Sequence, residues 1–196
     1  MELINNTSKT LKDDLSVEIK KGSKLSIAAA CFSIYAFQEL KKQLTSIEEL
    51  RFIFTSPTFV AEKTKKEKRE FYIPRLTRER SLNGTEFEIK LRNEMTQKAI
   101  AKECADWIKE KVTFKSNISD KTIQGQLVVD DTGYTPINNF TTVELGCEKG
   151  NVISTTIVKD QSLAQTLIRD FNEIWNDKKV LQEVTDEVVE SITAAY

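Results

Sequence analysis

The stretch from Lys121 to Gly146 brings together the polar residue types most able to do chemistry. Two short β-rich runs flank a turn at Asp130 and Asp131, at a spacing typical of a hairpin. The candidate site residues are four amides and a carboxylate: Gln124, Gln126, Asp131, Asn138 and Asn139. Amide side chains donate and accept hydrogen bonds but take up no proton near neutral pH. They could therefore line a cleft that binds a phosphodiester without cutting it, or they could simply satisfy backbone groups at a sheet end.

Histidine is absent from the 196-residue chain. This absence excludes Ser-His-Asp and Cys-His nucleophile systems, histidine general bases and most zinc sites. The phosphate-binding sequence G-x-x-x-x-G-K-[ST] does not occur either, so any ATPase activity must lie outside these residues. Adjacent acidic residues point in different directions on an element, and none gives a readable magnesium-nuclease geometry. We expect no cofactor and no metal site.

The spacing of Gln124, Gln126 and Asp131 resembles the phospholipase D motif His-x-Lys-x-x-x-x-Asp, with glutamine at both reactive positions. The sequence Asn-Asn-Phe-Thr from Asn138 is similar to the family's Gly-Ser-x-Asn-Phe-Thr element in eroded form. The pattern KLSIAAACFSIYAFQEL, followed by LRFIFTSPTFV, looks like the phospholipase D-like module found ahead of the motor in a group of bacterial Swi/Snf-type helicases. The similarity runs through nearly the whole chain, to DFNEIWND.

The resemblance implies that the family's nucleophile position falls on Gln124 and its phosphate-binding lysine on Gln126. Glutamine neither attacks phosphorus nor supplies a positive charge. Losing both groups should remove far more than the roughly 10²–10⁴-fold that one general acid–base contributes. We therefore predict an inactive hydrolase centre. Active members build one site from two modules, so a homodimer or a second module elsewhere is expected.

The formal net charge of −1 gives no bulk electrostatic reason to bind nucleic acid, but the charge is unevenly distributed. A basic segment, within which Phe71 and Tyr72 could stack on bases, lies in the middle of the chain. Its cations are Lys63, Lys65, Lys66, Lys68, Arg69, Arg75, Arg78 and Arg80. This segment could contact the phosphates of DNA or RNA, or it could be an ordinary solvated loop. The end of the chain from Leu181 onward is acidic and argues against nucleic-acid contact there.

Periodicity and turn signals predict alternating helices and strands with a polar, weakly periodic region over 61–93. Helices are expected over Thr7–Lys21, from a cap at Ser33 through Leu44, over Glu94–Lys111, over Gln161–Asn176 and over Val180–Ala195. Strands are expected over Leu25–Ile34, Leu50–Thr55, Val112–Lys115 and Asn151–Val158, in addition to the two runs of the hairpin. The β-α-β order at the start predicts a parallel pair of strands.

The fold we predict is α/β, of phospholipase D-like type, with a mixed, largely parallel β-sheet flanked by helices on both faces. Residues 1–178 would form the domain, and residues 179–196 a C-terminal helix that leads to a downstream helicase motor. No apolar run is long enough to span a bilayer, no secretory signal begins the chain, and the three scattered cysteines read as reduced structural thiols. These features favour a cytoplasmic protein without membrane contact, and the resemblance implies a bacterial source.

Three functions follow from these observations. The first is a catalytically inactive module that binds or targets nucleic acid. The second is a protein-interaction or dimerisation scaffold that does not touch nucleic acid. The third is a residual phosphodiesterase or nuclease.

Overall fold

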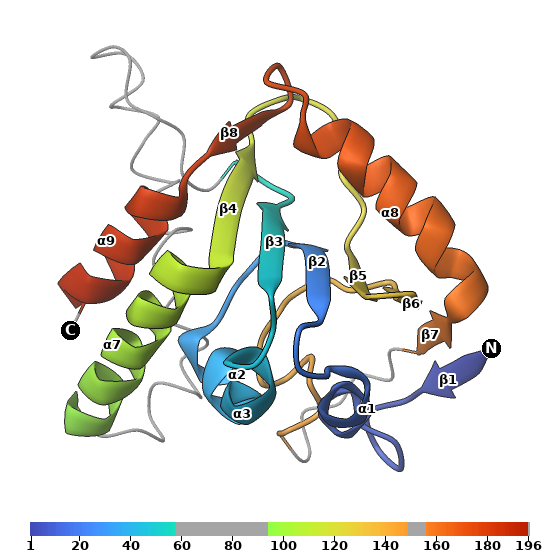
Figure 1. The fold of residues 1–196 in the computed structure, drawn as a ribbon, viewed down its shortest axis with the longest axis horizontal. Helices are drawn as coiled ribbons and strands as arrows, with labels where there is room; N and C mark the ends of the chain where they lie inside the picture. The colour runs from blue at the N-terminus through green and yellow to red at the C-terminus, as the bar shows by residue number, and fades with distance from the viewer. Residues whose placement is uncertain (58–93, 149–155, 196) are drawn as a thin grey trace.

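The computed structural model describes residues 1–57, 94–148 and 156–195 (Figure 1). The strands are β1 (Glu2–Ile4), β2 (Lys24–Ala29), β3 (Glu49–Phe54), β4 (Val112–Asn117), β5 (Gln126–Val129), β6 (Thr132–Thr135), β7 (Ile157–Asp160) and β8 (Leu181–Glu183). The helices are α1 (Leu11–Glu18), α2 (Ile34–Glu39), α3 (Lys41–Leu44), α7 (Glu94–Lys111), α8 (Gln161–Trp175) and α9 (Thr185–Ala195). Of these helices, none is long and apolar enough to cross a membrane.

The strands described form one eight-stranded sheet in the order β1-β7-β6-β5-β2-β3-β4-β8. The pairs β2–β3 and β3–β4 are parallel, whereas the other five neighbouring pairs are antiparallel. The prediction of a largely parallel sheet is therefore wrong. The parallel pairing expected at the start of the chain is confirmed, but the β5–β6 hairpin and three short strands extend the sheet in antiparallel fashion on both sides.

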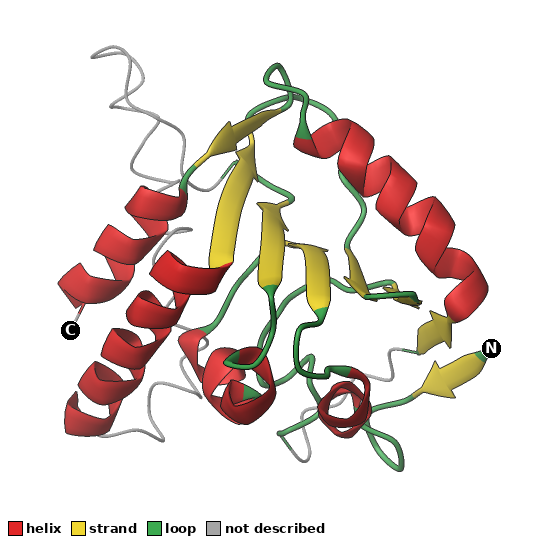
Figure 2. Ribbon diagram, in the orientation of Figure 1, coloured by secondary structure: helices red, strands yellow, loops and turns green. Residues whose placement is uncertain are grey.

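Helices cover both faces of this mixed sheet, as expected (Figure 2). Ile27 and Phe52 face a large core that also takes in buried residues of α1, α2, α7 and α9. Ala28 and Ile53, one residue further along each strand, face a smaller core beneath Phe171 of α8. Since α8 lies against β5 and β6, it covers its face of the sheet only in part (Figure 1).

The two longest helices were predicted well because their apolar periodicity is strong. The bounds of α7 agree with the prediction, and Ile100, Cys104 and Trp107 are buried as expected. Met95 was assigned to the same apolar stripe, but 84% of it is exposed. α8 begins after Asp160, whose side chain accepts a hydrogen bond from the backbone N–H of Ser162 at 2.9 Å. Of the residues predicted to point inward from α8, the half-buried ones are Leu163, Leu167, Ile168 and Trp175.

The first helix is shorter than predicted because asparagine turns precede it. The Asn5 side chain accepts hydrogen bonds from the backbone N–H groups of the next turn, and Asn6 has a φ of 58°. Thr10 then caps α1 by accepting from the backbone N–H of Asp13 at 3.1 Å. The residues ahead of this turn form β1, which pairs with β7 and was not predicted.

Several other boundaries also differ from the prediction. β2 ends at Ala29, and Ser33 caps α2 as expected, but the helix breaks at Leu40 before α3 begins. The second run of the hairpin ends as a strand at Thr135. β7 runs to Asp160, while 151–155 and the polar region 61–93 lie outside the described residues.

The end of the chain is not a single helix. β8 pairs with β4, and the backbone N–H of Val184 donates to the carbonyl of Phe114 at 2.9 Å. α9 follows with Val188 and Ile192 fully buried in the large core beside α7. That residues 179–196 lead to a further domain stays a prediction.

Candidate nucleic-acid interface

The structure separates Asp131 from the two motif glutamines. Gln124 is exposed and precedes β5, whereas Gln126 is buried and begins it. The side-chain nitrogen of Gln126 donates to the carbonyl oxygen of Leu167 in α8 at 3.1 Å. Asp131 is exposed on the turn beyond the other end of β5, a strand that runs about 10 Å from Gln126 to Val129 at roughly 3.3 Å per residue. Gln126 therefore ties α8 to the sheet by satisfying a backbone carbonyl.

The two asparagines lie in the loop after β6, close to the start of β5. The carbonyl of Asn138 accepts from the backbone N–H of Ala30 at 2.9 Å, just beyond the end of β2. The Glu144 carboxylate accepts in turn from the backbone N–H of Asn138 at 2.9 Å. Burial raises the pKa of Glu144, while hydrogen bonds from the backbone of Asn138 and Asn139 oppose the rise. This loop is thus held by backbone contacts, and the asparagine side chains are only partly buried or exposed.

The basic segment from Lys63 to Arg80 lies outside the described residues. Its role in binding nucleic acid stays a prediction. Within the described ranges, no group of three or more cysteine, aspartate or glutamate side chains could hold a metal ion.

Two cations, Arg51 and Lys115, lie on the face of the sheet that α8 partly covers. Arg51 is the register partner of Ser26, and Lys115 is the partner of Ile53, so all four side chains share that face. Arg51 donates from Nη2 to Ser26 Oγ at 3.0 Å. Lys115 donates from Nζ to the carbonyl oxygen of Trp175 at 2.8 Å. Both cations are half-buried.

Aromatic rings of α8 hold these cations against the sheet. Phe171 and Trp175 stack with their centroids 5.5 Å apart. The Arg51 guanidinium carbon lies 4.9 Å from the Phe171 centroid and 5.5 Å from the Trp175 centroid. The Lys115 ammonium lies 4.3 Å from the Trp175 centroid. These are cation–π distances, and they orient both positive charges beside a half-buried indole.

No ion pair links either cation to a carboxylate within the described ranges. Burial lowers the pKa of Arg51, and the more distant charge of Glu49 opposes this. Burial also lowers the pKa of Lys115; Glu183 opposes the shift, whereas Arg51 and Lys178 add to it. A partly buried charge without a counter-ion is destabilised, and a bound anion would relieve that cost. We call Arg51, Lys115, Phe171 and Trp175 the cation–aromatic cluster.

This cluster was not predicted from the sequence, although its two cations carry a signal there. In LRFIFT, Arg51 alternates with core-facing Leu50 and Phe52, and Lys115 similarly follows core-facing Phe114. A cation on the second face of a buried strand is unusual enough to mark a site. The contact between Trp175 and Lys115 could not be predicted from the sequence, because the two residues are 60 positions apart in the chain.

All three cysteines are free thiols. Burial raises the pKa of Cys104, and burial followed by the charge of Glu39 raises the pKa of Cys147 to about 12. Because the thiolate is the reactive form, we expect at most one thiol per native chain to react with Ellman's reagent near pH 8. Unfolding in guanidinium should release all three. Fast reaction of two or more thiols in the native protein would contradict this assignment.

No protein-family model matches the chain, and no curated protein matches it. Among solved structures, the fold is similar to that of TrmBL2, an archaeal chromatin protein whose structure is described as showing a novel mode of DNA binding. The TM-score is 0.41 at 13% sequence identity, and the match covers 93% of this chain and 52% of that one. The chain thus spans about half the length of that protein. A likeness this distant carries no argument about function, and the phospholipase D-like helicase assignment stays a prediction.

Proposed function

We propose that this chain is a non-catalytic nucleic-acid-binding module that holds a single strand at the cation–aromatic cluster beside α8. The observation that carries the proposal is the cation–aromatic cluster, in which Arg51 and Lys115 are half-buried without a carboxylate partner among the described residues. Single-stranded DNA or RNA complements this cluster. Its phosphates supply the negative charge that the two cations lack, and its bases can stack on aromatic rings.

The cluster favours a single strand over a duplex for a geometric reason. Its cations lie on the sheet strands β3 and β4 rather than on a protruding helix or hairpin that could enter a groove. The half-buried Trp175 ring adjoins both charges, so one nucleotide could place its phosphate on Arg51 or Lys115 and its base against the indole edge. Lys178, close enough to lower the pKa of Lys115, would add a further phosphate contact.

Binding without cleavage is proposed because the resemblance places glutamine at both reactive positions, and glutamine is neither a nucleophile nor a general base near neutral pH. The chain has no histidine, and Gln126 is committed to the Leu167 carbonyl. An eroded phospholipase D-like module, placed ahead of a helicase motor as the resemblance implies, would help to hold the strand on which that motor acts. The basic segment over 63–80 would lengthen the binding surface, and charge reversal at Lys65, Lys66 and Arg69 tests that part separately.

Replacing either cation of the cluster should weaken binding to a single strand. We expect Arg51→Gln and Lys115→Gln each to reduce the affinity for a fluorescein-labelled oligothymidylate by about tenfold, because a hydrogen bond to a charged group contributes roughly 1.5–3 kcal/mol. Each variant should also lower the slope of log affinity against log salt by about 0.7 per lost phosphate contact. Fluorescence anisotropy over a salt series measures both quantities.

Lys42→Gln is the matched control. Lys42 is an exposed lysine of α3, and α3 packs on the other face of the sheet because its Leu44 belongs to the large core. The control should bind like the native protein. Quenching of Trp175 fluorescence on binding, measured in a Trp107→Phe background, would locate the strand beside α8. Absence of binding at low salt, or equal losses in Lys42→Gln and Arg51→Gln, would overturn the proposed function.

A further inference from the structure

A hollow of about 320 Å³ lies beside α8, between this helix and the turn that joins β5 to β6. Two carboxylates, two amides and two apolar side chains line it: Asp130, Asp131, Gln161, Gln165, Ala164 and Ile168. Pockets that bind small groups are typically about 300–1,000 Å³ and combine apolar walls with a few polar groups that fix orientation. The hollow therefore has the size and the composition of a site for a nucleobase.

The turn holds its two carboxylates in different states. Both carboxylate oxygens of Asp130 are engaged, one by the hydroxyl of Ser23 at 2.7 Å and one by the backbone N–H of Lys24 at 2.9 Å. These bonds fix the turn against the start of β2. Within the described ranges, Asp131 has only a long contact with the hydroxyl of Thr132, at 3.5 Å, and no ion pair. The carboxylate of Asp131 is therefore available as a hydrogen-bond acceptor.

α8 is fixed against the sheet on the other side of the hollow. A Cβ atom at Gly133 of β6 would lie 2.9 Å from Leu167 Cδ1 and 3.3 Å from the backbone nitrogen of Ala164, so the helix lies directly on the strand. Gln161 and Gln165 are exposed next to the buried Ala164. Their amides can both donate and accept hydrogen bonds. A rigid helix thus places two amides and an apolar wall at the hollow.

The hollow and the cation–aromatic cluster lie on the same flank of α8. Ile168 lines the hollow, and Trp175 of the cluster follows seven residues later, so both project from nearly the same side of the helix. At 1.5 Å per residue they are about 10 Å apart along its axis. A strand held at the cluster can therefore extend along α8 into the hollow. Because Asp131 repels phosphate, the part of the strand that enters the hollow is a base.

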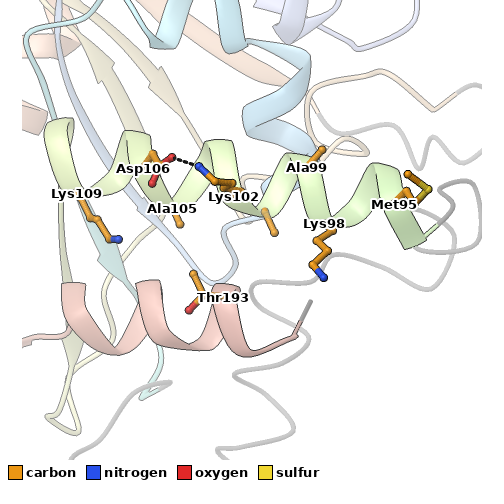
Figure 3. Close-up of a pocket in the computed structure, with 9 residues that line it drawn as sticks. Met95, Lys98, Ala99, Lys102, Ala105, Asp106, Lys109 and Thr193 are labelled. Atoms are coloured by element: carbon orange, nitrogen blue, oxygen red, sulfur yellow. Dashed lines mark hydrogen bonds and ion pairs between the residues drawn. The ribbon is translucent and has the colours of Figure 1, made fainter.

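Among the residues that the structure describes, two other hollows offer no such carboxylate. A larger one, of about 480 Å³, follows α7 on the other face of the sheet, and its Asp106 pairs with Lys102 at 3.1 Å (Figure 3). Another, of about 350 Å³, lies beside β1, where Glu2 and Glu18 pair with Lys159 and the remaining carboxylate caps α8. The carboxylates of both are already engaged by the chain itself.

From these observations we infer that the hollow beside α8 binds a guanine base of the single strand, an inference that rests on the proposed function. Guanine has two adjacent donors on its Watson–Crick edge, N1–H and the N2 amino group, and one carboxylate accepts from both. Its O6 oxygen would accept from the amide of Gln161 or Gln165. Adenine and cytosine place a ring acceptor beside their amino group, and thymine places carbonyl oxygens on both sides of its N–H. Asp131 therefore selects guanine.

Oligonucleotides that differ by single chemical groups test this selection on the full chain. The probes are fluorescein-labelled strands of about 12 nucleotides. One is oligothymidylate, one alternates guanine with thymine, and one alternates hypoxanthine with thymine. Hypoxanthine differs from guanine only in lacking the N2 amino group. By fluorescence anisotropy, we expect the guanine strand to bind about tenfold more tightly than oligothymidylate, with the hypoxanthine strand between them.

Asp131→Asn should reduce the preference for guanine over thymine to within about twofold and should not weaken the binding of oligothymidylate. The change keeps the size of the side chain but replaces an acceptor oxygen by a donor, which would face the donors of guanine. Asp170→Asn is the matched control. Asp170 is exposed and lies two residues after Ile168, on the opposite side of α8, so its variant should keep the native preference.

Equal binding of the guanine and thymine strands would overturn the inference. Equal binding of the guanine and hypoxanthine strands would contradict the bidentate contact on which it depends, and so would a guanine preference that survives in Asp131→Asn. These results leave the proposed function intact, because oligothymidylate would still bind at the cation–aromatic cluster. Absence of binding by all three strands at low salt would instead overturn both.

Discussion

Gly125→Ala is expected to lower the free energy of unfolding by about 3 kcal/mol or more, or to prevent folding. A Cβ atom at this position would overlap the carbonyl oxygen of Ile137 and would lie 2.7 Å from the carbonyl carbon. On its other side, the carbonyl oxygen of Ala28 would be 3.3 Å away. Backbone atoms cannot rotate away as a side chain does, so the strand and the loop would have to separate.

Hydrogen bonds resist that separation. The backbone N–H of Ile137 donates to the carbonyl of Gly125 at 3.1 Å, and the N–H of Ala30 donates to the carbonyl of Asn138 at 2.9 Å. Moving the loop would break both bonds at the end of β2. Urea denaturation measures the loss through the midpoint, with circular dichroism as the check on native structure.

Gly22→Ala is the matched control, because it isolates the conformational cost of adding a methyl group. A Cβ at Gly22 would meet nothing within 4 Å, but its φ of +82° is left-handed. That conformation costs a non-glycine residue about 1 kcal/mol. Similar losses in the two variants would show that the loop and β5 do not approach each other as closely as the structure has them.

Gly125 also shows why the motif could be found in the sequence while its geometry could not. It stands between the two glutamines that resemble the phospholipase D motif, and from the sequence it reads as one glycine in a β-rich run. Its importance comes from a loop twelve residues further on, which no local pattern reveals. The same loop holds Asn138 at the sheet end through its backbone, and the Gln126 side chain donates to the carbonyl of Leu167.

The fold was predictable where the signal was local and strong. Apolar periodicity predicted α7, the run LRFIFT predicted β3, and the β-α-β order predicted its parallel pairing with β2. The direction of the sheet as a whole was not predictable, because β1, β7 and β8 are three or four residues long. Strands this short form only because they pair with a neighbour, and the partner of β1 is β7, more than 150 residues later in the chain. The pairing depends on tertiary structure, so local propensity did not predict it.

Lys159 is the second residue whose replacement should have a large effect, because it neutralises several carboxylates at once. Its ammonium lies 3.1 Å from the carboxylate of Asp14, 2.8 Å from that of Glu18 and 3.3 Å from that of Glu2. Asp14 is buried and also accepts a hydrogen bond from the hydroxyl of Tyr134 at 2.5 Å. These contacts tie α1 to β1, β6 and β7, the antiparallel half of the sheet.

The pKa shifts of this network define the pH range in which it stabilises the fold. Burial disfavours the ammonium of Lys159, but hydrogen bonds to Glu18 and Asp14 outweigh it and raise the pKa above its ordinary value of 10.5. A raised pKa in the folded state means that the contribution is fully present below pH 10.5 and is lost only as the pH rises through the folded value. Burial and the bond to Asp14 likewise raise the pKa of Tyr134, which stays a donor. Neutral pH therefore reports the full effect.

We expect Lys159→Met to lower the free energy of unfolding by about 3 kcal/mol at neutral pH, since removing one partner of a buried pair leaves an uncompensated charge. Lys12→Met is the matched control: Lys12 also bridges two elements, at 2.8 Å from Glu39, but 36% of its side chain is exposed. Exposed pairs of this kind contribute at most about 1 kcal/mol. Urea denaturation of both variants decides whether burial sets the difference, and equal losses would contradict it.

A double-mutant cycle separates the ion pair from the packing of the two side chains. Asp14→Asn/Lys159→Met should lose clearly less than the sum of its single variants, because each change alone leaves the other charge without its main partner, whereas the double change removes both. Coupling of about 1–3 kcal/mol would place the stabilisation in the pair itself. Simple additivity would instead mean that Glu2 and Glu18 already satisfy Lys159, and that α1 is held to the sheet by its apolar contacts through Leu11 and Leu15.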